Sequence, residues 1–128
     1  MRINGVHHIA IIASDYGVSK AFYQQVLGFT LEAEYYRADR QSWMGKLALN
    51  GSYIVELFTF PNTPPRRSGP EALGLRHLAF EVDDVPTARA ELLSKGIACE
   101  DLRIDPNTGN DMVFFRDPDG LPLELYGA

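Results

Sequence analysis

Two histidines and two glutamates are the residues of this sequence whose types and spacing could carry chemistry. His77 follows His8 by 69 residues, and Glu124 follows Glu56 by 68 residues. Two imidazoles and two carboxylates suit Zn²⁺, Ni²⁺, Co²⁺, Mn²⁺ or Fe²⁺, and a set without thiolate argues against a closed structural zinc site. An octahedral ion with four protein ligands keeps positions for water or substrate, so the predicted metal site is of the kind that catalysis requires.

Each of these residues taken alone has a simpler explanation. A single histidine in a strand is more often a core or surface residue than a ligand, and a single glutamate is more often solvated. The four are different because a duplication relates them in two pairs, His with His and Glu with Glu. His7 shares a strand face with Ile9 and Ile11, and it is predicted to be an ordinary histidine.

The second half of the sequence repeats the pattern of the first. The segment "HHIAIIASDYGVSKAFYQQVLGFTLEAE" from His7 matches "RHLAFEVDDVPTARAELLSKGIACEDL" from Arg76. The repeat predicts an α+β protein of two βαβββ modules. Module 1 is expected over about 4–60 and module 2 over about 75–126, joined by a proline-rich linker over 61–74.

Each half is predicted to contain a strand, a helix and three further strands. Strands are expected over 6–13, 30–36, 43–49 and 53–60, and again over 75–82, 98–104, 112–116 and 121–126. The expected helix N-caps are Asp15 and Asp84, the expected left-handed C′ residues are Gly28 and Gly96, and turns are expected at Asn50 and Asp117. The buried helix stripes are predicted to be Val18, Ala21, Phe22 and Val26, then Val85, Ala88, Leu92 and Leu93.

The alternation of side chains along a strand predicts where the four candidate ligands point. Ile11 and its equivalents are expected to pack on the helices, so His8 and His77 should lie on the opposite face. Glu56 and Glu124 stand among apolar neighbours, and a carboxylate is costly to bury unless it is neutralised. If the two sheets curve toward each other, the two imidazoles and two carboxylates converge.

The composition argues against polyanionic and membrane partners. The chain has 128 residues, 45% of them hydrophobic, a formal net charge of −5 and a pI near 5.1. Its one cysteine, Cys99, forms no internal disulfide, and the start Met-Arg-Ile-Asn-Gly lacks the apolar stretch of a signal peptide. We therefore expect a cytoplasmic protein with no nucleic acid partner and no membrane partner.

Five motifs carry a resemblance to a known family: VHHIAI, FYQQVLGF, VELF, LRHLAFEVDD and DPDGLPLEL. Through them, nearly the whole chain resembles the vicinal oxygen chelate superfamily, and within it the glyoxalase I-like (lactoylglutathione lyase-like) branch. The resemblance implies that the two modules form a cupped mixed β-sheet, the glyoxalase/bleomycin resistance/dioxygenase fold, with one divalent metal ion at its centre.

The ligand pattern favours glyoxalase I within that superfamily. Extradiol dioxygenases and fosfomycin-resistance thiol transferases typically have no ligand at the position of Glu56, epimerases commonly have Gln there, and bleomycin-binding members generally lack the set. The resemblance implies a lyase or isomerase that acts on a small α-hydroxycarbonyl or hemithioacetal by proton transfer through a metal-bound enediolate. Glu124 is the predicted base, and Glu56 could serve the mirror-image proton. The alternatives are an epimerase, a dioxygenase or a non-catalytic binding protein.

The substrate positions depart from the family pattern. Bacterial glyoxalase I proteins usually carry an Arg four residues after the first ligand and an Asn four residues after the second, and both help to hold glutathione. Here these positions are Ile12 and Phe60, so glutathione dependence is doubtful. Arg37 and Trp43 are the predicted substrate contacts, and the other arginines considered for an anionic substrate are Arg40, Arg66 and Arg67.

The resemblance also implies a homodimer. Family members pair their modules either within one chain or between two chains. The 14-residue linker does not decide between these arrangements.

Overall fold

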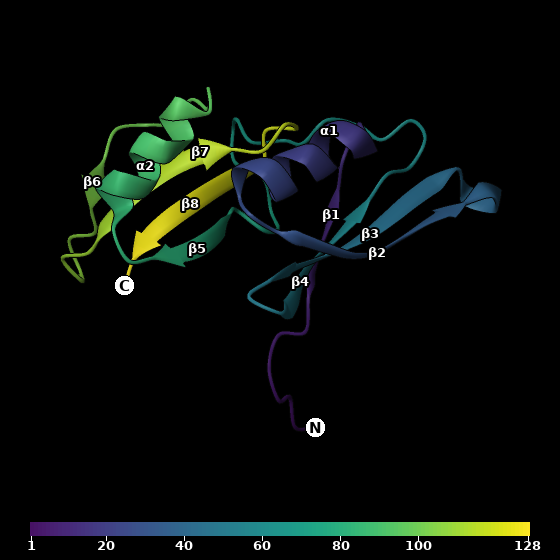
Figure 1. Ribbon diagram of the computed structural model, residues 1–128, viewed down its shortest axis with the longest axis horizontal. Coiled ribbons are helices and arrows are strands. Elements are labelled where there is room, and N and C mark those ends of the chain that lie inside the picture. Colours follow the sequence, from purple (N-terminus) through teal and green to yellow (C-terminus); the bar gives the residue numbers. More distant parts are fainter. The chain divides into compact units, whose positions relative to one another are not determined.

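The computed structural model describes residues 1–128, which form two compact units, Met1–Pro64 and Pro65–Ala128. Each unit has its own four-stranded mixed sheet and its own helix (Figure 1). The predicted fold class, α+β with two βαβββ modules, is confirmed.

In the first unit, Glu56 lies on an inner strand, and His8 directly precedes the edge strand that pairs with it in parallel. Its sheet has the order β1-β4-β3-β2, in which β1 is parallel to β4 and the other pairs are antiparallel. The strands β2 and β3 form a long hairpin (Figure 1). The elements are β1 (Ile9–Ile12), α1 (Tyr16–Ala21), β2 (Thr30–Arg37), β3 (Ser42–Leu49) and β4 (Ser52–Phe58).

The second unit repeats this topology. Its sheet order is β5-β8-β7-β6, with β5 parallel to β8, and its helix lies across β7 and β8 (Figure 1). The elements are β5 (Leu78–Val82), α2 (Val85–Ser94), β6 (Arg103–Ile104), β7 (Asp111–Arg116) and β8 (Pro122–Gly127).

Three strands begin well after their predicted first residues. Pairing of β1 with β4 begins at Ile9, and pairing of β5 with β8 begins at Leu78, so the residues before them lie outside the ladders. The strand expected over 98–104 is reduced to β6 and an isolated bridge between Cys99 and Phe115. As a result, His8 and His77 directly precede β1 and β5 instead of lying inside them.

The predicted helix caps are confirmed. The Asp15 side chain accepts a hydrogen bond of 3.0 Å from the Val18 amide, and the Asp84 side chain accepts one of 2.8 Å from the Thr87 amide. Gly28 has φ 80° and Gly96 has φ 79°, the left-handed conformation that ends a helix at lowest cost on glycine. None of the helices is both long and apolar enough to cross a membrane.

The predicted buried stripes were partly wrong. Val18 is 54% exposed and Leu93 is 45% exposed. The first helix turns Tyr16 and Ser19 inward, and beyond Ala21 it widens into a π-helical turn over Phe22–Val26. The wider turn rotates the later positions, so Tyr23 is buried together with Phe22.

Two turns connect the strands that carry the glutamates. Asn50 and Gly51 both have positive φ, 51° and 79°, as a two-residue hairpin between β3 and β4 requires. Before β8, the Asp117 carboxylate accepts hydrogen bonds of 2.9 Å from the amides of Asp119 and Leu121. Both predicted turns are confirmed.

Candidate metal centre

In the first unit, His8 and Glu56 lie together on the sheet face that faces away from α1. Glu56 pairs in register with Ala10, and His8 lies two residues before Ala10, so the two side chains share a face. The flanking Val55 and Leu57 point to the other face and are buried. The distance from His8 Nε2 to Glu56 Oε1 is 3.7 Å.

The second unit builds the same pair at the equivalent positions. Glu124 pairs in register with Ala79, and His77 lies two residues earlier. His77 Nε2 is 3.0 Å from Glu124 Oε2. Glu124 is only 6% exposed, and a carboxylate in such a place needs a positive partner to offset its desolvation.

Two neighbours that sequence reasoning missed hold the first pair. The Tyr53 hydroxyl donates a 2.6 Å hydrogen bond to Glu56 Oε2, and the Tyr53 ring stacks on the His8 ring at 5.1 Å. The Nδ1 atoms of His7 and His8 are 2.8 Å apart, within hydrogen-bonding distance. His8 Nε2 is therefore left to face Glu56, which is how neighbouring groups orient metal-binding histidines.

A β-bulge brings Tyr53 to Glu56. Strict alternation would place Tyr53 on the buried face of Val55. The register instead shifts, with Leu47 opposite Val55 and Ala48 opposite Tyr53, so Tyr53 reaches the face of Glu56. Burial and the hydrogen bond to Glu56 raise the pKa of Tyr53 above its usual range, which keeps the hydroxyl protonated and able to donate.

The second pair has no such hydroxyl. The residue 68 positions after Tyr53 is Leu121, and Glu124 has an ion pair with His77 as its polar contact. The edge of Phe114 meets the His77 ring at 5.2 Å and 86°. The two carboxylates therefore differ: Glu56 accepts a hydrogen bond from a phenol, whereas Glu124 pairs with its histidine and has Arg76 as a second positively charged neighbour.

The structure brings the four predicted ligands together as two pairs, one within each unit. Within either unit, no group of three His, Cys, Asp or Glu side chains is placed to hold an ion. Each pair nevertheless offers one imidazole nitrogen and one carboxylate, the donor types that divalent first-row metals accept. The chemistry of each pair therefore fits one half of the ligand set that the sequence analysis predicted.

The two predicted substrate residues of the first unit lie on opposite faces of its sheet. Arg37 pairs with Ser42, and its guanidinium lies 5.5 Å from the centre of the Phe58 ring, on the face of Glu56. Its Nε is buried without a hydrogen-bond partner. Trp43 stacks on Tyr16 of α1 at 5.0 Å, so it lies on the helix-covered face and not with Glu56.

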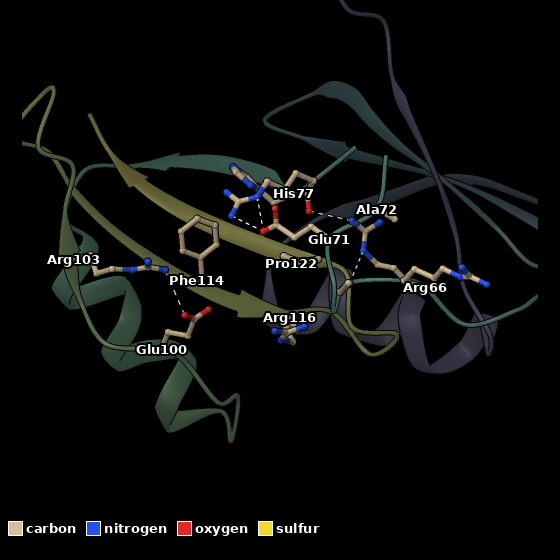
Figure 2. A pocket seen from close by; sticks show the side chains of 12 residues that line it. Arg66, Glu71, Ala72, His77, Glu100, Arg103, Phe114, Arg116 and Pro122 are labelled. Carbon is tan, nitrogen blue, oxygen red and sulfur yellow. Dashed lines mark hydrogen bonds and ion pairs between the residues drawn. The ribbon is translucent and has the colours of Figure 1, made fainter. Parts of the chain in front are cut away.

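The remaining arginines are also separated. Arg40 ends the short 3-10 turn Ala38–Arg40 at the tip of the β2–β3 hairpin and is exposed. Arg66 and Arg67 line a cavity of about 300 Å³ in the second unit, which His77 also lines (Figure 2).

Comparison with known proteins connects this geometry to a family. The model of the Glyoxalase/Bleomycin resistance protein/Dioxygenase superfamily matches residues 5–125. The chain belongs to this superfamily. The match confirms the predicted resemblance, and it spans both units and all four candidate ligands.

Similar proteins occur in several bacteria. The chain is 64% identical to YaeR of Escherichia coli (strain K12) over 121 residues, 94% of each chain. It is 56% identical to YwkD of Bacillus subtilis (strain 168) over 126 residues, 98% of each chain. A glyoxalase family protein from Enterococcus faecalis has a crystal structure with a TM-score of 0.90 and 45% identity, covering 98% of this chain and 99% of that chain.

The first unit has an apolar surface beside Glu56. Ile12 pairs in register with Phe58, and Phe60 stacks on the Phe58 ring at 5.7 Å. Ile12 is 53% exposed. Neither Ile12 nor Phe60 can donate a side-chain hydrogen bond to a substrate carboxylate.

Proposed function

We propose that this protein is a metal-dependent lyase or isomerase of the glyoxalase I type, acting on a small α-hydroxycarbonyl or hemithioacetal. The observation that supports the proposal is the matched pair of His–Glu contacts, at 3.7 Å in one unit and 3.0 Å in the other. The duplicated units place the same two donor types at equivalent positions. Unrelated surface residues would not be expected to repeat in this way.

His8, Glu56, His77 and Glu124 would hold one divalent ion from the Ni, Zn, Co, Mn and Fe group. Four ligands without thiolate leave room for substrate in an octahedral sphere. When bound, the ion supplies Lewis-acid stabilisation of negative charge on substrate oxygens. The modules that share it belong either to one chain or to the two subunits of a homodimer.

Glu124 is the proposed general base. Its carboxylate is buried next to His77 and, unlike that of Glu56, receives no hydrogen bond from a tyrosine hydroxyl, so it has an oxygen available to accept a substrate proton. It would take the proton from the carbon next to the carbonyl and return it to the neighbouring carbon. Glu56, held by Tyr53, serves mainly as a ligand and could accept the mirror-image proton.

The substrate is proposed to be small and not to depend on glutathione. Ile12 and Phe60 present apolar surface where a charged carrier would need donors. Arg37, on the face of Glu56, keeps an unused Nε donor and is the candidate contact of the first unit for a substrate oxygen.

Metal content and turnover test the proposal together. Protein purified without chelator should contain about one ion per pair of modules, and His8→Ala and His77→Ala should lose it. Asp39→Ala is the control and should keep the ion, because Asp39 is exposed at the tip of the β2–β3 hairpin and contacts neither His–Glu pair.

The metal-replete protein should convert the hemithioacetal of methylglyoxal formed with at least one of glutathione, cysteine or coenzyme A. Absence of turnover with every thiol would count against the lyase. Oxygen uptake by the Fe²⁺ form with catechols would indicate a dioxygenase instead. Ligand-induced stabilisation without any metal requirement would indicate a binding protein.

We also propose a homodimer. Its mass would be twice the 14.3 kDa of the chain, and sedimentation of 14.3 kDa particles alone would contradict it.

A further inference from the structure

The cavity of the second unit is unusually rich in arginine. Its volume of about 300 Å³ lies at the lower end for small-molecule sites, enough for a compact ligand. Three of its arginines come, like His77, from the segment before β5, and the other two lie on the strands β6 and β7. The five arginines that line it are Arg66, Arg67, Arg76, Arg103 and Arg116.

Only two of these five charges are neutralised by carboxylates. Arg76 donates two hydrogen bonds, of 2.9 and 2.6 Å, to Glu71 Oε1. Arg103 pairs with Glu100 at 3.4 Å. Glu71 and Glu100 are the acidic residues that line the cavity, so an excess of positive charge remains in a chain whose formal net charge is −5.

The other three arginines differ in how they are held. The Arg66 guanidinium donates to the carbonyl oxygens of Leu75 and Arg76, at 2.7 and 3.1 Å, which fixes it without cancelling its charge. Arg67 and Arg116 form no hydrogen bond or ion pair. Two guanidinium groups thus have all their donors available to a ligand.

The cavity lies on the same sheet face as the His77–Glu124 pair. In the register of β7 and β8, Arg116 stands opposite Pro122, and Phe114 stands opposite Glu124. His77 and Phe114 line the cavity themselves, and their rings are in contact. A ligand in the cavity would therefore lie beside the histidine that we propose as a metal ligand.

We propose that this cavity binds an oxyanion, the carboxylate or phosphate group of the substrate, through Arg67 and Arg116. The planar guanidinium group donates two parallel hydrogen bonds to either oxyanion. Arg66, Arg76 and Arg103 contribute positive potential. This inference deepens the proposed function: it adds an anionic group to the small carbonyl substrate, to be held next to His77.

The test uses the full chain without metal, so it does not depend on turnover. Inorganic phosphate and acetate are titrated separately into the chelator-treated protein by calorimetry. We expect saturable binding of at least one of them, and the stronger of the two identifies the oxyanion class. Arg116→Gln and Arg67→Gln should each weaken it by about five- to tenfold, the lower range for charge-assisted hydrogen bonds at exposed groups. Arg40→Gln is the matched control and should bind like the wild type.

Two results would overturn the inference. One is the absence of saturable binding of both anions. The other is an equal weakening of anion binding by Arg40→Gln. That result would show that the affinity depends on the net charge of the protein and not on this cavity. Amide chemical shifts locate the anion independently, because phosphate or acetate should perturb residues 66–68 and 114–116, and perturbation elsewhere alone would contradict the site. Anion binding without lyase turnover would refute the proposed function and leave this site standing.

Discussion

Replacing Tyr53 by Phe tests whether the first module contributes a metal ligand. The change removes a single hydroxyl that donates a 2.6 Å hydrogen bond to Glu56 Oε2, and it keeps the ring that stacks on His8. If Glu56 binds the ion, losing this hydrogen bond frees its carboxylate to rotate away. The apparent metal affinity should then fall.

The expected loss is about tenfold in metal affinity, or about 1.4 kcal/mol. Loss of a group that orients a ligand costs about 10 to 100-fold. The lower value applies because the Glu56 side chain is 18% exposed, so water can replace part of the hydrogen bond. Affinity is measured by competition for Zn²⁺ or Co²⁺ with a chromophoric chelator near neutral pH.

Tyr35→Phe is the matched control for this measurement. Tyr35 is 52% exposed, and its loss of a hydroxyl should leave metal affinity unchanged. Far-ultraviolet circular dichroism should show both variants folded. If Tyr53→Phe binds the metal as tightly as the wild type, Glu56 is not a ligand held by Tyr53, and the reasoning that assigns the two carboxylates different roles fails.

Three further predictions concern stability. Hydrogen bonds from the Asn107 amide and the Tyr126 hydroxyl lower the pKa of Asp105, so the stabilisation that they give is present above the unfolded pKa of this carboxyl and is lost as the pH falls. In urea unfolding between about pH 5 and about pH 3, Asp105→Asn should therefore lose less stability than the wild type. Equal losses in the two proteins would contradict this prediction. In Gly45→Ala the new Cβ would lie 2.5 Å from the Tyr16 hydroxyl. We expect the free energy of unfolding to fall by about 1–3 kcal/mol, and the fluorescence of Trp43 to change because Tyr16 stacks on it. An unchanged melting temperature would show that Tyr16 can move freely. Leu123 is fully buried, so Leu123→Ala should cost about 2–5 kcal/mol in chemical denaturation, and a cost below about 1 kcal/mol would mean that the core of the second unit collapses around the gap.

Much of the fold was predictable because its determinants are local and occur twice. The N-cap aspartates Asp15 and Asp84 and the two C′ glycines each act within one helical turn. The period-two alternation grouped Glu56 with Phe58 on one strand face, and the parallel register of β1 and β4 then places it beside His8. Because of the duplication, each local pattern occurs a second time at the equivalent position. This repetition distinguishes a residue that the fold requires from one that occurs there by chance.

The parts of the site that sequence reasoning missed depend on departures from regular geometry. Tyr53 reaches Glu56 only because a bulge reverses the alternation in β4. Neither the Asn50-Gly51 turn nor the apolar residues of the strand predict that bulge from the sequence. Trp43 was expected near the substrate, but it shares the alternation of the buried Leu47 and stacks on α1. The two-residue period of the strand alone would have placed Trp43 on the helix-covered face.

The arginine cavity could not be predicted as a unit. Its residues come from the segment before β5, from the short strand β6 and from the end of β7. No period or spacing relates these positions, and they become neighbours only through the pairing of β6, β7 and β8. Sequence reasoning identified Arg66 and Arg67 as candidates, and the register added Arg103 and Arg116.

The presence of a phenol beside Glu56 and of Leu121 at the equivalent place beside Glu124 has a consequence for how two carboxylates could divide the work of proton transfer. In a centre built from two identical halves, either carboxylate could take a substrate proton equally well. The hydroxyl of Tyr53, present in one unit only, removes that equivalence because it restrains Glu56 and not Glu124. A substrate would then react in the one orientation that brings its acidic proton to the carboxylate without a phenol.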